Sequence, residues 1–427
     1  MTFSLLTNIS VMSQNNKEFN SGEPIIGQLF SFIPSDIFSK AAFLCNSDLK
    51  FRKMTSKVHF ICLFYAVLTR NPSLREVCKN ITLVSRKLIA YGLTILPCKS
   101  TLSDANRKRD SEYFAHIYRL LFEHYRVFLN NKQFCLPIGG EVDASRVEVF
   151  DSTTITLFKE IMKGAGRNSL NGKKKVGIKA FTKMNLQEGV PNFICFKAAS
   201  QNENTFLKIL KLEKGSISTF DKGFCKYHYF NQMNEEEKYF VTRLKDNAKY
   251  EVIEEIKEVE AHLGILKDQM IELEYRHEKT CRTVRLRLVT FKDPITLELL
   301  CFLTNLIDKK ASTITQIYKN RWVIEVLFKQ IKQNFELKYF LSDSENGIKS
   351  QIWMALIQNL LFTVIHRMIK EAEDFSTLVQ VAAKNLCSYV NIIRFLVDTR
   401  AYIKGWHKAE LDIIQIDLFT NKEGGTS

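Results

Sequence analysis

The sequence predicts a mixed α/β protein in which an all-helical N-terminal domain precedes an α/β core that is interrupted by a β-rich insertion. Apolar residues recur at helical spacing from about residue 26 to 130. Strand-like and helical runs then alternate from about 146 to 244, as in proteins built on a mixed sheet. Basic and apolar residues alternate from 281 to 291, which indicates a half-buried strand, and helical spacing returns after 313.

The length and the charge of the chain limit the classes of protein to which it can belong. A chain of 427 residues suggests two to three domains. Its 61 Lys and Arg against 46 Asp and Glu give a net charge of +15, which favours polyanionic partners, nucleic acid before acidic membrane surfaces. The ten cysteines include no C-x-x-C pair, which predicts reduced thiols and disfavours a zinc site. The most apolar stretch, 352–365, is too short to span a membrane, so we expect no membrane partner.

In the N-terminal region, residues 58–68 are almost continuously apolar and predict a buried helix, and 74–88 predict another. Pro97 marks a break. Ser103 is the expected N-cap of a long helix that runs through Tyr125. The expected strands of the core are 146–150, 175–182, 192–198, a short run ending at Asp221 and 239–244, with a helix over 202–212. The strands 281–291 and 297–305 are expected to form the β-rich insertion.

Two aspartates stand at the ends of expected strands. Asp151 follows the strand that ends at Phe150, and Asp221 follows Phe220. Functional groups collect at the carboxyl ends of strands in α/β sheets, and Mg²⁺ prefers carboxylate oxygens. A strand-end aspartate taken alone is more often a turn former.

The helix expected from Ile314 gives stronger evidence of a functional site, because it contains several chemically active residues. Tyr318, Arg321, Glu325 and Lys332 are separated by steps of 3, 4 and 7, which place them on one helical face. A carboxylate flanked by cations and a phenol suits a metal ion beside a phosphodiester. The alternative is a solvated face with an Arg321–Glu325 pair worth only ~0.3 kcal/mol.

These residues resemble a known family. The spacing Y-(2)-R-(3)-E-(6)-K is the signature of the DDE transposases of bacterial insertion sequences, in the branch called the IS-four family, and the four residues of the helix match it at every position. The segments Asp151-Ser152-Thr153-Thr154 and Asp221-Lys222-Gly223-Phe224 are similar to the family's first two acidic motifs. Further similar segments are 100–106, 303–305, 340–346 and 351–353.

The resemblance implies an RNase H-like fold with a β-insertion between the second and third acidic residues. It implies that Asp151, Asp221 and Glu325 are catalytic and bind two Mg²⁺ ions, for which Mn²⁺ can substitute. It also implies cut-and-paste transposition, in which water cuts the element's ends and the freed 3′-hydroxyl attacks target DNA. The partners would be the terminal inverted repeats, target DNA and a second copy of the chain, at the nucleoid in the bacterial cytoplasm.

The positions of several basic residues allow two interpretations. Lys173, Lys174 and Lys175 either follow a phosphate backbone or form a solvated turn, and the run 107–109 either contacts the element's ends or lies in solvent. Arg282, Arg285 and Arg287 either contact DNA or solvate an exposed sheet. The predicted DNA-binding residues are Tyr318, Arg321, Lys329, Lys332, Lys173, Lys174 and Lys175.

The predicted insertion contains no Trp to stack on a flipped base, so Tyr250, Tyr275 or Phe291 is the candidate there, and Trp322 is assigned to the core. The expected domain boundaries are a tail at 1–27, a helical domain that binds the DNA ends at 28–135, the core at 136–249 and 301–400, the insertion at 250–300, and a C-terminal tail at 401–427.

Other functions remain open at this point. One is an RNase H-like nuclease without strand transfer, and another is a non-catalytic DNA-binding protein derived from a transposase. The retained acids Asp151, Asp221 and Glu325 favour an enzyme. A basic membrane-surface protein is disfavoured because no basic amphipathic helix carries an apolar anchor.

Overall fold

The computed structural model divides the chain into two compact units. One contains the described residues up to Leu121 together with those from Ser350 onward, and the other contains Phe122–Lys349. The residues described are 22–49, 53–131, 138–156, 177–199, 204–207, 209–256, 259–278, 280–335, 337, 339–369 and 374–397.

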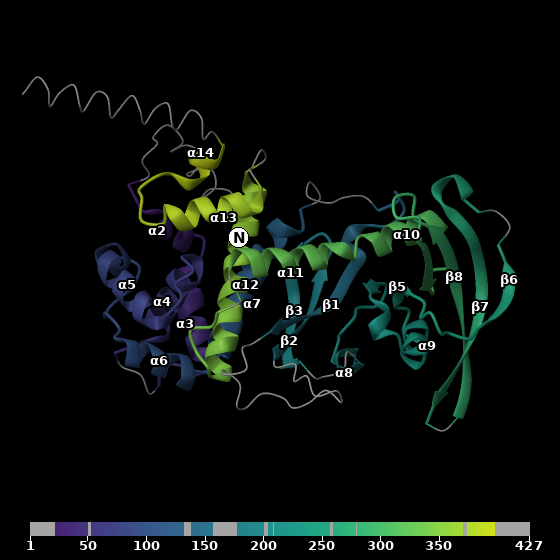
Figure 1. Cartoon of the computed structure of the whole chain (residues 1–427), viewed down its shortest axis with the longest axis horizontal. Coiled ribbons are helices and arrows are strands. Elements are labelled where there is room, and N and C mark those ends of the chain that lie inside the picture. The colour runs from purple at the N-terminus through teal and green to yellow at the C-terminus, as the bar shows by residue number, and fades with distance from the viewer. Residues whose placement is uncertain are drawn as a thin grey trace, which may run out of the picture. The chain divides into compact units, whose positions relative to one another are not determined.

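The first unit is helical, and its N-terminal and C-terminal helices pack together. The amide of Ile25 donates to the carbonyl of Ser388 at 2.9 Å. The buried side-chain amide of Gln358 donates to the carbonyl of Phe64 at 2.8 Å. The unit contains α2 (Ile25–Ser31), α3 (Ser35–Leu44), α4 (Ser56–Leu68), α5 (Leu74–Ile89) and α6 (Lys99–Lys108), most of α7 (Glu112–Leu129) and α12 (Glu345–Met368), and α13 (Phe375–Lys384) and α14 (Ile392–Val397) (Figure 1).

This packing corrects two expected boundaries. The tail predicted over 1–27 ends too late, because Ile25 and Ile26 are fully buried in α2. The predicted C-terminal boundary of the catalytic core, at residue 400, is also too late. The apolar helices after residue 350 belong to the first unit and bury their side chains against the N-terminal helices. The C-terminal tail predicted over 401–427 lies outside the described residues.

The long helix expected from Ser103 is also wrong. Helix α6 starts at Lys99, and the backbone turns extended at Arg109, where φ is −81° and ψ is 140°. Arg109 is buried there, with its guanidinium bonded to Asp48, Ser56 and the carbonyl of Met54. The chain therefore breaks into two helices because Arg109 anchors the loop before α4.

Helix α12 has the length and hydropathy of a membrane span, and it is the only such helix within the described residues. It runs for 24 residues, which is longer than the apolar stretch 352–365 suggested. Its apolar window is 89% buried inside the protein, as expected for a helix that forms a core.

The second unit is built on one nine-stranded sheet. Strands β4 and β5 run parallel to β1, whereas β2 is antiparallel to β1 and β3 to β2. The order β3-β2-β1-β4-β5 with these directions is the RNase H-like arrangement, which confirms the predicted fold class. The strands are β1 (Val147–Thr156), β2 (Gly177–Asn185), β3 (Pro191–Ala198), β4 (Ile217–Phe220), β5 (Tyr239–Arg243), β6 (Glu251–Glu255), β7 (Ile265–His277), β8 (Thr280–Lys292) and β9 (Leu299–Thr304) (Figure 1).

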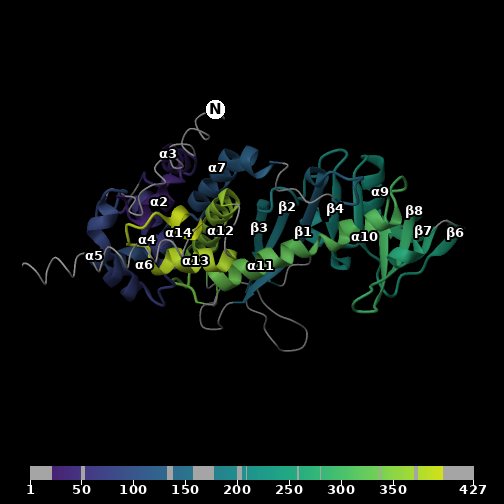
Figure 2. The same cartoon turned by 90° about the horizontal axis from the view of Figure 1, so that it is seen from above.

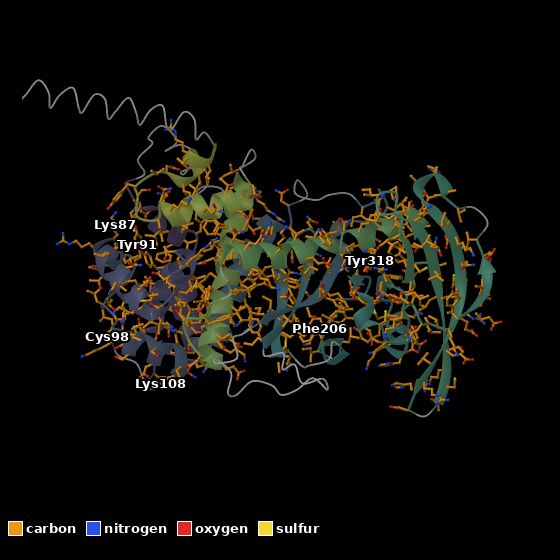
Figure 3. The ribbon with its side chains drawn as sticks, in the orientation of Figure 1. Lys87, Tyr91, Cys98, Lys108, Phe206 and Tyr318 are labelled. Atoms are coloured by element: carbon orange, nitrogen blue, oxygen red, sulfur yellow. The ribbon has the colours of Figure 1, made fainter. Side chains whose placement is uncertain are left out.

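The two faces of the sheet carry separate apolar clusters, because side chains alternate along each strand. On one face Phe150, Phe220 and Phe240 pack with Phe206 and the residues around α9 (Tyr227–Glu235). On the other face Val147, Ile217 and Val241 pack under α10 (Ala311–Lys319), which contributes Ile314, Ile317 and Tyr318. Phe206 and Tyr318, labelled in Figure 3, belong to the two clusters.

The β-rich insertion extends the core sheet rather than forming a sheet of its own. Strands β6, β7 and β8 pair in antiparallel order and join β5 through β9. The β7–β8 hairpin projects beyond the other strands (Figure 1).

The arginines of β8 have different roles. Arg285 is exposed and pairs with Glu272, so it remains open to solvent or DNA. Arg287 is buried and paired with Asp268 at 2.6 Å. Its Nη1 also donates to the carbonyls of Leu306, Ile307 and Lys309, which join the insertion to the segment before α10.

Replacement of Arg287 by Met should destabilise the second unit by about 3–5 kcal/mol, because it leaves Asp268 as an uncompensated buried charge. The matched variant Arg285→Met should cost less than about 1 kcal/mol, because its pair with Glu272 is exposed. Urea unfolding followed by circular dichroism measures both. Equal shifts of the two unfolding midpoints would contradict the structural role of Arg287.

Candidate active site

The parallel pairing of β1 with β4 brings the two aspartates to equivalent positions. Val149 is the last residue of β1 paired with β4, and its partner is Thr219. Asp151 and Asp221 each follow two residues later, so they stand side by side in register. The strand expected to end at Phe150 continues through Asp151 to Thr156, because β2 pairs with it along that length.

Both aspartates point to the face that carries α10. Residues two apart in a strand share a face, so Asp151 follows Val147 and Val149, and Asp221 follows Ile217 and Thr219. Val147 and Ile217 belong to the cluster under α10. Seen from above, α10 and α11 (Trp322–Asn334) run along this one face of the sheet (Figure 2).

Local backbone bonds hold both carboxylates. Oδ1 of Asp151 accepts from the amide of Ser152 at 2.7 Å. Asp221 caps the 3₁₀ turn Lys222–Phe224 and accepts from the amide of Gly223 at 3.4 Å. Asp221 is therefore a turn former as well as a member of the site.

The sequence suggested that the signature residues lie on one continuous helix, but the structure divides them between two helices. Helix α10 ends at Lys319 and α11 begins at Trp322, with Arg321 at the junction. Tyr318 is 8% exposed, and its ring packs 4.8 Å from that of Phe302. The ring of Tyr318 therefore belongs to the core, and its predicted contact with DNA stays a prediction.

Arg321 joins two of the three predicted catalytic acids. Its Nη2 lies 2.6 Å from Oε1 of Glu325, and its Nη1 lies 3.5 Å from Oδ2 of Asp151. The guanidinium also lies 5.5 Å from the centroid of the Tyr318 ring. Its Nε is buried and has no hydrogen-bond partner among the described residues. Such a buried donor is costly unless a ligand accepts from it.

The electrostatics of the site centre on Asp151. Burial raises the pKa of Asp151 to about 6, and the negative charges of Asp221 and Glu325 raise it further. The Ser152 amide and Arg321 act in the opposite direction, without compensating fully. Burial is thus the main reason that Asp151 resists ionisation in the free site.

The other predicted DNA-binding residues are only partly placed together. Nζ of Lys332 donates to Oγ1 of Thr153 at 2.6 Å, which brings this lysine to β1 two residues beyond Asp151. Lys329 is exposed on α11. Lys173, Lys174 and Lys175 lie outside the described residues.

Trp322 was wrongly assigned to the core. Its side chain is 62% exposed beside Arg321, on the same side of α11 as the exposed Val326. The steps of buried residues in α11, at Ile324, Leu327 and Ile331, carry the signal that Trp322 faces away from the core. Of the stacking candidates in the insertion, Tyr250 is exposed and Phe291 is buried.

The donor set fits a hard divalent cation. Three carboxylates supply the oxygen ligands that Mg²⁺ prefers, and because burial raises the pKa of Asp151, a bound cation would favour its charged form. Within the described ranges, however, no three acidic, histidine or cysteine side chains gather closely enough to share an ion. Arg321 contacts both Asp151 and Glu325, so its guanidinium lies between these two acids in the free protein.

Comparison with known families identifies the class of protein. Residues 142–360, 219 of the 427, match the family described as "Transposase DDE domain". The chain belongs to this transposase family. Residues 21–94 of the transposase match a second family, "Domain of unknown function (DUF4372)".

Individual relatives are distant. The predicted transposase y4zB of Sinorhizobium fredii is 28% identical over 286 residues, which cover 64% of this chain and 72% of the relative. The predicted transposase for insertion sequence element IS4SA of Synechocystis sp. is 26% identical over 273 residues, covering 62% and 71%. A solved piggyBac transposase synaptic complex with hairpin DNA gives a TM-score of 0.43 at 13% identity, covering 89% of this chain and 82% of that one.

Replacement of Asp151 by Asn should stabilise the metal-free transposase at pH 8 by about 2–3 kcal/mol. The folded-state pKa of about 6 lies above the ordinary 3.8, so the folded state binds more protons between these values and loses stability as pH rises through this window. The gain should therefore shrink as pH falls from 6 and vanish below 4. Chemical unfolding in EDTA at several pH values measures it.

The matched control is Asp246→Asn, because Asp246 is exposed. It should leave the unfolding midpoint at pH 8 unchanged within the error of the measurement, because surface substitutions of this kind have little effect. An Asp151→Asn gain that does not depend on pH would show that burial of the ionised carboxylate is not its cause.

Proposed function

We propose that this transposase moves an insertion sequence by cutting its ends and joining them to target DNA, with Asp151, Asp221 and Glu325 as the catalytic acids. The observation that carries the proposal is the register of β1 with β4, which sets Asp151 beside Asp221 on the face that carries Glu325. Family membership supports a transposase as the class of enzyme.

The three acids would hold two divalent cations, Mg²⁺ or Mn²⁺. When bound, these ions would supply activation of the attacking oxygen and stabilisation of the leaving oxygen. The protein's own task is to fix the acids and to keep the site ready for charge. The amide of Ser152 holds Asp151, and the 3₁₀ turn after β4 holds Asp221.

The basic residues of the site would position the phosphodiester. Nε of Arg321 is a buried donor without an acceptor among the residues that the structure describes, so a phosphate oxygen is a suitable partner for it. Lys332, held by Thr153 near Asp151, would contact a neighbouring phosphate, and Lys329 would follow the strand along α11. Tyr318 would act mainly by packing beside Arg321.

The proposed reaction consists of two successive phosphoryl transfers. In the first, water attacks the phosphorus at the element's end, a P–O bond forms, and the 3′-oxygen leaves and takes up a proton. In the second, that 3′-hydroxyl loses its proton and attacks a target phosphodiester, whose own 3′-oxygen leaves. The partners would be the terminal inverted repeats and target DNA, in a dimer that holds both ends, at the nucleoid in the cytoplasm.

The test is a cleavage and joining assay with duplexes that carry the terminal repeats of the element that encodes the chain. Mg²⁺ or Mn²⁺ should support cutting at the ends and joining to a target plasmid, and EDTA should abolish both. Asp151→Asn, Asp221→Asn and Glu325→Gln should each reduce cleavage by more than about 100-fold. Such a loss is larger than the one usually seen when a residue that only supports a metal ligand is replaced. The control is Glu235→Gln, an exposed acid of α9, which should keep full activity.

Each other outcome selects another function. Cutting without joining would favour a nuclease without strand transfer. Binding to the repeats without cutting in either metal would favour a non-catalytic DNA-binding protein. Undiminished cleavage by Glu325→Gln would overturn the assignment of the third acid.

A further inference from the structure

Helix α5 presents an outer face that the active site does not use. Its core side is formed by the fully buried Val77, Ile81 and Leu88. The N-cap Ser73 accepts from the amide of Glu76 at 3.3 Å, which fixes the start of the helix. In both views α5 lies at the rim of the helical unit (Figures 1 and 2).

Three cations lie directly opposite that buried side. Arg75, Lys79 and Arg86 follow one another by steps of 4 and 7, so at about 100° per residue they fall within about 40° of each other. All three are exposed. None forms an ion pair with any residue that the structure describes.

Several other exposed cations on the helices of this unit are paired with acids, whereas Lys99 and Lys384 stand singly without an ion pair among the described residues. Lys40 pairs with Asp36 at 2.6 Å. Arg107 and Lys108 both pair with Asp104, at 2.7 and 2.8 Å. These pairs on α6 weaken the sequence-based alternative that the run 107–109 contacts DNA, since Arg109 is buried as well. A stripe of three cations without ion pairs among the described residues therefore distinguishes α5 from its neighbours.

Apolar and hydroxyl groups lie among these cations. Leu83 is 83% exposed, and Thr82 is exposed beside it. From Arg75 to Arg86 the helix rises about 16 Å, which exceeds the ~12 Å width of the DNA major groove. Cations near both ends of the stripe can thus reach phosphates on the two sides of the groove, while Thr82 and Leu83 face the base edges between them.

We propose that the outer face of α5 binds duplex DNA in the major groove and reads the element's terminal repeats. Arg75, Lys79 and Arg86 contact phosphates, and Thr82 and Leu83 discriminate among bases through contacts such as those with thymine methyl groups. The reading of terminal repeats rests on the proposed function, whereas binding of duplex DNA by this face does not.

Lys87 of the same helix has a different place. Its Nζ donates to the carbonyl of Cys387 and lies 5.1 Å from the centroid of the Tyr389 ring. Lys87, labelled in Figure 3, thus packs against the C-terminal segment of the unit. It is not part of the proposed DNA contact.

The test measures binding of the full chain in EDTA, so that cleavage plays no part. Fluorescence anisotropy is recorded with a terminal-repeat duplex and a scrambled duplex over a series of salt concentrations. The variant Arg75→Gln/Lys79→Gln/Arg86→Gln should weaken binding to both duplexes. Three lost phosphate contacts at about 0.9 each predict a slope of log K against log salt that is shallower by about 2.7.

The matched control removes the same charge from paired cations, as Lys40→Gln/Arg107→Gln/Lys108→Gln. Its slope should change by less than about 1, and circular dichroism should show both triple variants folded. Leu83→Ala should leave binding to the scrambled duplex unchanged and lower the preference for the terminal repeat by about fivefold or more.

Three outcomes would overturn the proposal. The first is equal effects of the two triple variants, which would reduce α5 to a contributor of net charge. The second is an unchanged repeat preference in Leu83→Ala together with an unchanged slope in the α5 variant. The third is binding to vesicles of anionic phospholipid that the α5 variant loses while its DNA binding stays intact. Failure of cleavage in the earlier assay would leave these binding results standing, so the two proposals fail separately.

Discussion

The parallel register of β1 with β4 is the constraint on which the candidate site depends. A shift by one residue would turn one aspartate to the opposite face of the sheet, among the phenylalanines around Phe150 and Phe220. Those rings and the aliphatic cluster under α10 therefore do more than fill the core. By requiring Val147 and Ile217 on one face and Phe150 and Phe220 on the other, they fix where Asp151 and Asp221 point.

The interaction that completes the site is the contact of Arg321 with Asp151 and Glu325. It neutralises part of the negative charge of the acids, yet the pKa of Asp151 remains raised and Nε of Arg321 has no acceptor within the described part of the chain. Both features are what a site awaiting a cation and a phosphate would show, and each costs stability in the free protein. Arg321 would then exchange carboxylate partners for phosphate partners when DNA and metal bind.

The sequence predicted the fold class because its motifs are local: strand alternation, helical spacing and the Y-R-E-K signature are each read within about fifteen residues. It failed where a distant contact decides. The buried bonds of Arg109 with Asp48 and Met54 break a helix that the periodicity continued. The apolar helices after residue 350 read as core without showing which core they join. Trp322 was misplaced because an aromatic residue was assumed to be buried, although the spacing of Ile324 and Leu327 indicated otherwise.

We propose that Asp151, Asp221 and Glu325 share divalent cations once Arg321 releases Glu325. The decisive experiment is a crystal structure of the transposase with a terminal-repeat duplex and Mn²⁺, located by anomalous scattering. Anomalous peaks are expected about 2.0–2.6 Å from carboxylate oxygens of all three acids, the range for hard cations, with Arg321 turned to a phosphate. Mn²⁺ bound elsewhere, or the 2.6 Å contact of Arg321 with Glu325 retained in the complex, would contradict it.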